Sequence, residues 1–294
     1  MKTFTKQSFL LFHTAPALRL LGCWMTLLII VVCSFGCQPL PKVQLRQFTF
    51  EREYKVEKDS LFIFLPNPLA CPLRLSASSK QLAIQKVLDQ HFPFILPANA
   101  DTSFQGALID WTEGEAVISF RYVFGDPADT IISDTIALPF PKGKTYEIIQ
   151  GYKGSFSHNS DYSRYAIDFN LQIGDTICAA ADGSVVGVIE GYTYGGNSKR
   201  WRPYANFITL YHPQLGLFTQ YVHLDHLGSF VAVGDAVQQG QAIGLSGETG
   251  FTSVEHLHFN VLKNTESSLS STPVYFGKEG YPGEKMKRKM NITH

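Results

Sequence analysis

The sequence has little charge and no excess of either sign. Charged residues make up 17% of the 294 residues, and 25 lysines and arginines balance 25 aspartates and glutamates. A protein that binds nucleic acid through its phosphates normally carries a surplus of basic residues. The balanced composition therefore gives no reason to expect a nucleic-acid partner.

Cysteine is also scarce, and most of it lies near the amino terminus. Three of the five cysteines fall within the first 37 residues, so that only Cys71 and Cys178 remain for the rest of the chain. Two isolated cysteines form neither a disulfide framework nor a zinc site of the cysteine type. We expect both to be buried and reduced; a bridge between them is the alternative.

The apolar run from Leu20 to Phe35 is shorter than the roughly 18 residues of a membrane-spanning helix. Basic residues precede the run and a turn-forming segment follows it, which is the layout of an export signal. The sequence thus predicts a signal over residues 1–37 and a location in the cell envelope. Gly36 followed by Cys37 resembles a bacterial lipoprotein site, so Cys37 is the expected lipid anchor to the membrane. An uncleaved signal anchor is the alternative.

The remaining sequence lacks long helical patterns and is rich in turn and strand residues. The full sequence has 24 glycines and 15 prolines, and short runs of Val, Ile, Phe, Tyr and Thr recur. This composition predicts an all-β protein. Residues 43–141 are expected to form a small β-sandwich-like domain, with a short helix between Ser79 and Phe92. No catalytic pattern of titratable residues occurs in this region, so we expect it to pack against, space or regulate a second domain.

A proline-containing segment from Leu138 to Lys144 is the expected linker. Residues 146–280 are expected to form a second domain built on an antiparallel β-sheet. A Gly-Asp turn, a short strand, a second glycine turn and another strand occur after Ile173 and again after Val233. The C-terminal segment 281–294, which is rich in basic residues, is expected to form a flexible tail.

His256 and His258 flank Leu257 and form the clearest chemical pattern of the second domain. Residues two apart on a strand point to the same face, so the two imidazoles would lie side by side and Leu257 would face the core. Neutral imidazole is a good zinc ligand. A solvated strand face that carries two histidines is the competing interpretation.

Asp168 stands inside the apolar segment Ala166–Asn170. A buried carboxylate is costly unless it is paired or binds a metal, although an aspartate at a strand end can instead cap a turn. His158 lies upstream in a polar loop, where a histidine is usually exposed. Asp161 of the same loop is a competing ligand that we expect to face solvent.

A third candidate is His223. Strand alternation predicts that Tyr221 and His223 share one face, and a histidine beside a tyrosine is a candidate general base. The other two histidines near this segment, His212 and His226, are expected to lie on the surface.

Together these segments resemble the M23 peptidases, the family of lysostaphin-like and LytM-like peptidoglycan endopeptidases. The family's pattern is a histidine, a later aspartate and a distant His-x-His, with a further histidine between them. The matching residues here are His158, Asp168, His223 and His256-Leu257-His258. The resemblance covers residues 146–280 and extends to the two strand-turn-strand segments. The spacing from His158 to Asp168 is longer than in many members, which widens the rim loop.

The resemblance implies that His158, Asp168 and His258 bind Zn²⁺, leaving the fourth position for water. One of His223 and His256 would take the proton of that water, and the other would stabilise the oxyanion. Asn206 matches an asparagine that is common before the family's central strand. With Tyr221 it is assigned to the substrate cleft.

The implied function is hydrolysis of peptide bonds in peptidoglycan cross-links or stem peptides by a monomeric zinc metalloendopeptidase. One alternative is a catalytically silent scaffold or activator of other cell-wall hydrolases, but every expected ligand is present. A lipoyl or biotin carrier is a second alternative, and it is disfavoured because Asp182-Gly183 stands where a carrier needs a lysine. A further hypothesis is that the first domain covers the cleft and makes the enzyme latent.

Overall fold

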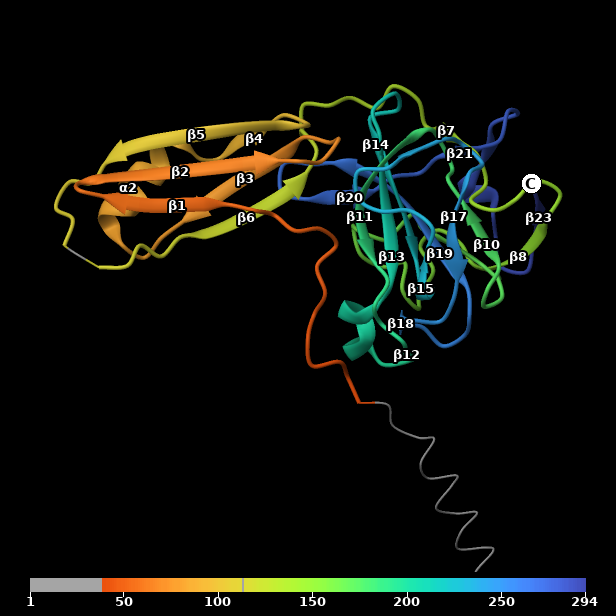
Figure 1. Ribbon diagram of the computed structural model, residues 1–294. Helices are drawn as coiled ribbons and strands as arrows, with labels where there is room; N and C mark the ends of the chain where they lie inside the picture. The colour runs from red at the N-terminus through yellow and green to blue at the C-terminus, as the bar shows by residue number, and fades with distance from the viewer. Residues whose placement is uncertain (1–38, 113) are drawn as a thin grey trace, which may run out of the picture. The chain divides into compact units, whose positions relative to one another are not determined.

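The computed structural model describes residues 39–112 and 114–294 (Figure 1). The expected signal segment and Cys37 lie outside the described residues. The described part is mostly strands, so the expected all-β fold is confirmed. None of the helices within it is long and apolar enough to cross a membrane.

Residues 53–124 form two three-stranded antiparallel sheets and one helix. The first sheet contains β1 (Glu53–Glu57), β2 (Ser60–Asn67) and β5 (Ala100–Ala107), in the order β1-β2-β5. The second contains β3 (Leu73–Ser78), β4 (Phe94–Leu96) and β6 (Ser119–Phe124), in the order β4-β3-β6. The short helix expected between Ser79 and Phe92 is α2 (Leu82–His91).

Alternating apolar residues bury one face of each of these two sheets. Leu61, Ile63 and Leu65 of β2 are at most 3% exposed, and Leu73 and Leu75 of β3 are fully buried. All five belong to one hydrophobic cluster, which agrees with the expected sandwich. Helix α2 adds three buried residues to this cluster: Ile84, Val87 and Leu88.

A nine-stranded sheet dominates the rest of the chain. Its order is β16-β11-β13-β14-β19-β9-β8-β23, and β20 pairs with β19. These strands are β8 (Thr145–Gln150), β9 (Ile167–Phe169), β11 (Gly183–Ile189), β13 (Phe207–His212), β14 (Leu217–Val222), β16 (Ala236–Val237), β19 (Leu257–Asn264), β20 (Leu269–Ser271) and β23 (Asn291–Thr293). Every pair within the sheet is antiparallel, as expected.

Smaller sheets complete the unit. One has the order β10-β17-β15, from β10 (Thr176–Cys178), β15 (Leu224–Ser229) and β17 (Ala242–Ser246). The others join β12 (Gly195–Gly196) with β18 (Gly250–Phe251), and β7 (Thr135–Ile136) with β21 (Tyr275–Phe276) and β22 (Tyr281–Pro282). Two short 3₁₀ helices are present, η1 (Lys199–Tyr204) and η2 (Gly283–Lys285).

The repeated turn-and-strand pattern corresponds to β10 and β11, and again to β16 and β17. Gly174 and Gly234, which begin the two Gly-Asp turns, have φ values of 86° and 100°. Positive φ is the reason these turns need glycine. Cys71 and Cys178 are buried free cysteines, as predicted.

The large sheet buries one face in its own core. Residues such as Leu210 of β13, Tyr221 of β14 and Phe259 of β19 point to this face and belong to one cluster. The opposite face is divided along the strands. At one end Val222 lies directly across from His258, and at the other end Phe218 lies across from Leu262. The end at Val222 carries the titratable side chain of His258, and the end at Phe218 is covered by the N-terminal sheets.

The N-terminal sheets contact the large sheet through apolar side chains, and Arg74 of β3 also donates to the Thr265 carbonyl, just after β19, at 2.9 Å. Phe124 of β6 stacks on Phe218, with ring centroids 6.0 Å apart. Val186, Tyr211, Phe218 and Leu262 are part of the same hydrophobic cluster as the core of the N-terminal sheets. The two regions therefore share a core.

The structure differs from the expected linker and tail. Leu138 and Phe140 of the expected linker are buried in the core of the large sheet. In the expected flexible tail, β23 pairs with β8 and Met286 is 1% exposed. The open hydrogen-bonding edge of β8 and the apolar Met286 explain why this segment is held in place.

Candidate metal centre

Two neighbouring strands bring Asp168 and His258 together. Asp168 of β9 and His258 of β19 are direct partners in the antiparallel ladder. Directly opposed residues on one face have neighbouring side chains. His158 comes from the loop between β8 and β9, where its N–H donates to the Gly154 carbonyl at 3.0 Å. His158 is fully buried and Asp168 is 3% exposed.

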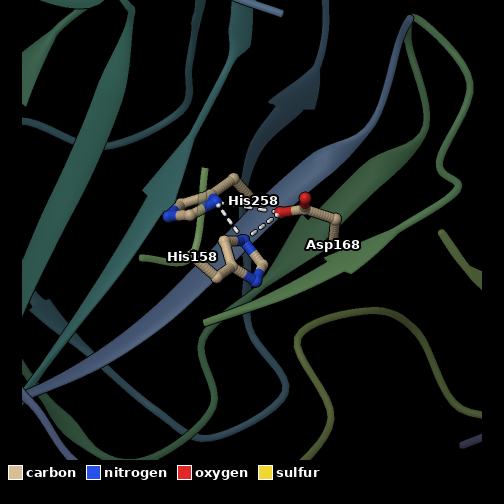
Figure 2. Close-up of side chains that lie close together, drawn as sticks. All are labelled: His158, Asp168 and His258. Carbon is tan, nitrogen blue, oxygen red and sulfur yellow. Dashed lines mark hydrogen bonds and ion pairs between the residues drawn. The ribbon is translucent and has the colours of Figure 1, made fainter. Parts of the chain in front are cut away.

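The three side chains point toward one another (Figure 2). Oδ1 of Asp168 lies 3.1 Å from Nε2 of His158 and 2.8 Å from Nδ1 of His258. The two ring nitrogens are 3.2 Å apart. The sequence-predicted ligands are thus assembled, and together they are a group that could hold a metal ion.

The donor set fits zinc. Tetrahedral zinc with bonds of about 2.0–2.1 Å places its ligand atoms roughly 3.3 Å apart, close to the three separations found here. Two imidazole nitrogens and one carboxylate oxygen form a three-ligand set of the type that catalytic zinc sites use. A cation held between the three atoms would offset the repulsion among their lone pairs in this buried place.

Neighbouring groups fix the orientation of these ligands. Nδ1 of His158 donates to the Gly151 carbonyl at 2.9 Å, which leaves Nε2 free for a metal. The amide of Gln150 donates to Oδ2 of Asp168 at 2.9 Å and to Ser157 at 2.7 Å. Sequence reasoning missed Gln150, because a glutamine at the end of a strand carries no signal until the fold brings it beside Asp168.

His223 and His256 lie next to the three ligands. Their ring centroids are 4.6 Å apart, and Nε2 of His256 is 3.7 Å from Oδ1 of Asp168. Nδ1 of His223 donates to the Thr249 carbonyl at 2.6 Å, and Nδ1 of His256 donates to the Val254 carbonyl at 2.9 Å. Both residues therefore keep Nε2 available for chemistry.

The position of His223 depends on an unusual backbone conformation. His223 follows the end of β14 and has a φ of 71°, so strand alternation stops there. Its N–H donates to the Asn206 carbonyl at 2.9 Å. The Asn206 side chain in turn bonds to both backbone groups of Tyr192 and to the Asp225 carbonyl. Asn206 thus holds the segment that carries His223.

Burial and neighbouring side chains shift the pKa values of the residues in this cluster in different directions. Burial disfavours the charged carboxylate of Asp168, but His158 and His256 outweigh it and hold its pKa well below the usual range. Burial lowers the pKa of His158 as well, but Asp168 reverses this and raises it. Burial lowers the pKa of His258, and it lowers that of His223 strongly, with His256 adding to the effect. His223 is therefore neutral at pH 7.

Two cavities flank the cluster. The first, called here the Asp168 half of the cleft, has a volume of about 660 Å³; its lining includes Gln150, Phe156, Asp168, His256, Lys287 and Arg288. The second, the His223 half, has a volume of about 460 Å³; its lining includes Gln47, Tyr162, Gln220, Val222, His223 and His258. An extended chain laid across both halves would pass over the cluster.

Two predictions about this region are wrong. Tyr221 does not line the cleft: it is fully buried, and its hydroxyl accepts the Ala180 N–H at 2.8 Å. The break in alternation at His223 is the reason the two residues do not share a face. His212 is not on the surface either, since it is fully buried against Thr219 and the Asp182 carbonyl.

The burial of four other residues can be compared with the sequence predictions. His226 and Asp161 are exposed, and Leu257 is fully buried, as predicted. Asn206 is fully buried, so it supports the cleft from behind.

Comparisons with known proteins find similarity to peptidases over the part of the chain that contains most of these residues. The family model described as Peptidase family M23 matches residues 162–269. The match contains Asp168, His223, His256 and His258, and His158 stands just before its start. A glycyl-glycine endopeptidase, ALE-1, of Staphylococcus capitis is 37% identical over 123 residues, which is 40% of this chain and 30% of the relative.

A second relative is the peptidoglycan DD-endopeptidase ShyB of Vibrio cholerae, 31% identical over 127 residues, which is 42% of this chain and 27% of the relative. The matches thus span less than a third of either relative. The solved catalytic domain of lysostaphin from Staphylococcus simulans is 28% identical; the match covers 44% of this chain and 87% of that domain, with a TM-score of 0.31. The sequence comparisons support a peptidase of the M23 type.

Proposed function

We propose that this protein is a zinc metalloendopeptidase that hydrolyses peptide bonds in peptidoglycan cross-links or stem peptides. The observation that carries the proposal is the buried cluster of His158, Asp168 and His258 with two further histidines beside it. The similarity to endopeptidases of the cell wall supports the substrate class.

His158 would bind the zinc ion through Nε2, Asp168 through Oδ1 and His258 through Nδ1. When bound, zinc lowers the pKa of a water molecule to about 7 and polarises a carbonyl group. The Gly151 carbonyl keeps His158 in the required tautomer, and Gln150 keeps the carboxylate of Asp168 in its orientation.

His223 and His256 would move the protons of the reaction. Each has Nδ1 engaged with a backbone carbonyl and Nε2 free at the cleft. One Nε2 accepts the proton of the attacking water and later returns it to the leaving amine. The other histidine would stabilise the carbonyl oxygen that gains negative charge, and for this its Nε2 would have to carry a proton in addition to the one on Nδ1. Because His223 is neutral at pH 7, its Nε2 has a lone pair available for the first task.

The cleft suits an extended peptide. Open cavities lie on both sides of the cluster, so the residues before and after the cleaved bond would each occupy one half. We further propose that the chain is a monomer exported to the cell envelope, where Cys37 attaches it to a membrane through a lipid or residues 1–37 serve as a signal anchor. The alternative role, a silent scaffold or activator, is not favoured because the ligand set is complete.

The test is mass spectrometry of purified peptidoglycan incubated with the protein. We expect new free termini on stem or cross-link peptides, and we expect them to disappear with a chelator and in the His258→Ala variant. The exposed His226→Ala variant is the matched control and should keep full activity. Unchanged peptidoglycan with zinc-loaded protein would contradict the proposal.

A further inference from the structure

The C-terminal segment forms one wall of the Asp168 half of the cleft. Lys287 and Arg288 line this cavity together with Asp168 and His256. The sequence predicted a flexible basic tail here, but the fold places two of its cations in the lining of the cavity that Asp168 and His256 also line.

Several contacts hold this segment firmly in place. Met286 is 1% exposed and belongs to the core of the large sheet. Gly151 approaches the Met286 carbonyl so closely that a Cβ atom would not fit there. Lys289 donates its N–H to the Ile148 carbonyl, and Met290 accepts the Ile148 N–H through its own carbonyl, both at 2.8 Å.

Residues 287–290 form a tight turn. The N–H of Met290 donates to the Lys287 carbonyl at 3.1 Å, and Lys289 has a φ of 71°. Lys287 and Arg288 therefore stand at fixed positions on a rigid turn. We name this element the basic turn.

The side chains of the basic turn have no acidic partner in the part of the chain that the structure describes. Lys287 and Arg288 are exposed, and neither takes part in an ion pair there. Asp168 is the acidic residue in the same lining, and its two oxygens are already engaged by histidines and by Gln150.

The His223 half of the cleft differs in charge. Its cation, Arg202, lies over the ring of Phe251 at 5.4 Å from the ring centroid. Serine, tyrosine and glutamine supply much of the remaining polar lining: Ser157, Ser160, Ser163, Tyr162 and Gln220. The Asp168 half thus carries two cations, Lys287 and Arg288, whereas the His223 half carries Arg202, which lies over an aromatic ring.

We propose that the basic turn binds a carboxylate of the substrate, so that the enzyme prefers peptides with an acidic group close to the cleaved bond. Lysine and arginine side chains on a fixed turn can donate several hydrogen bonds to one carboxylate. The inference rests on the proposed function, because it assigns substrate specificity to the same cleft.

The proposal is tested by measuring cleavage of pairs of cross-linked stem peptides. In each pair one carboxylate is either free or converted to a carboxamide. The variants are Lys287→Gln with Arg288→Gln, and Lys285→Gln as the control on the same segment, since Lys285 is exposed and does not line the cleft. We expect the double variant to lower kcat/KM for one free-carboxylate peptide about tenfold, mainly through KM. The matching carboxamide and the Lys285→Gln enzyme should show no change.

A binding measurement separates failure of this inference from failure of the proposed function. Calorimetry measures the affinity of the same peptides for the His223→Ala variant, which should bind them without turnover. The measurement is repeated with the two glutamine substitutions added. Selective loss of affinity for the carboxylate form supports the basic turn as the binding element even if no peptide is cleaved. Equal affinity for both forms, or the same loss with the control, overturns the inference while leaving peptide hydrolysis intact.

Discussion

Each of three histidines in the site donates a hydrogen bond from one ring N–H to a backbone carbonyl. His158, His223 and His256 donate through Nδ1 to the carbonyls of Gly151, Thr249 and Val254. A backbone partner sets the tautomer without adding charge, so Nε2 of each ring is left for metal or substrate. The precision of the site thus depends on the loops that carry these carbonyls.

The Asn206 side chain is expected to control His223 without touching the metal. Asn206→Ala leaves the buried backbone groups of Tyr192 unpaired, which should lower the free energy of unfolding by about 2–4 kcal/mol. Turnover should fall because His223 is displaced, while zinc is retained. Urea unfolding and zinc analysis measure these effects, and the exposed Asn197→Ala serves as control. Loss of zinc in Asn206→Ala would contradict this role.

His212 predicts a pH dependence of stability. Its Nδ1 donates to the Asp182 carbonyl, its Nε2 lies 2.7 Å from the Thr219 hydroxyl oxygen, and the ring is fully buried. Burial lowers its pKa to about 4. Above pH 6.5 the ring is neutral in both states and contributes no pH dependence. Between pH 6.5 and 4 only the unfolded state takes up the proton, so stability falls as pH falls, by roughly 3 kcal/mol.

Unfolding free energies between pH 4 and 8 check this expectation. His212→Gln should be less stable at pH 7 but should lose less stability on acidification than the parent protein, because the titrating group is gone. Parallel pH curves for the two proteins would show that His212 does not contribute as argued.

At the scale of secondary structure elements, regular strand alternation explains what the sequence could predict. Leu257 is buried between His256 and His258, and Asp168 is buried within β9, as the pattern indicated. The pairing of Asp168 with His258 was implied by the resemblance to the M23 peptidases and not by strand alternation. The pattern did not predict the positive φ of His223, which depends on the hydrogen bond to Asn206. It also did not predict the docked C-terminal strand, because pairing at the edge of β8 depends on tertiary structure.

The segment between η2 and β23 is expected to contribute to stability through Met286. Met286→Ala should lower the free energy of unfolding by about 2–5 kcal/mol because it leaves a cavity in the core of the large sheet. Met286→Leu conserves volume and should cost less than about 1.5 kcal/mol. Denaturant unfolding compares the two, and equal small effects would mean that the segment is not anchored by this side chain.

At the scale of the whole molecule, the N-terminal sheets and the large sheet share one hydrophobic cluster. Tyr211, Phe218 and Leu262 belong to that cluster, on the face of the large sheet that carries His258 farther along the strands. Gln47 lines the His223 half of the cleft. The N-terminal region therefore borders the cleft as well as covering apolar surface.

Removal of the N-terminal region is expected to cause self-association. A chain that starts at Lys142 would lose Leu138 and Phe140 from the core of the large sheet, so it should fold poorly.

A chain that starts at Ile132 retains β7 but exposes Tyr211 and Phe218. Light scattering should show oligomers, and Tyr211→Thr with Phe218→Thr should restore the monomer. A monomeric shortened chain without these substitutions would contradict the expectation.

The shortened chain with polar substitutions also tests whether the N-terminal region keeps the enzyme latent. Faster cleavage of peptidoglycan than by the longer protein would support latency. Equal rates would leave the region a structural role in covering Phe218 and its neighbours.

The most direct test of the whole account measures zinc content and peptidoglycan cleavage on the same samples. We predict one zinc per chain and full activity in the parent protein, one zinc without activity in His223→Ala, and neither zinc nor activity in His158→Ala. Zinc retained by His158→Ala, or full activity in His223→Ala, would contradict the assignment of ligands and proton-transfer residues on which the proposed function depends.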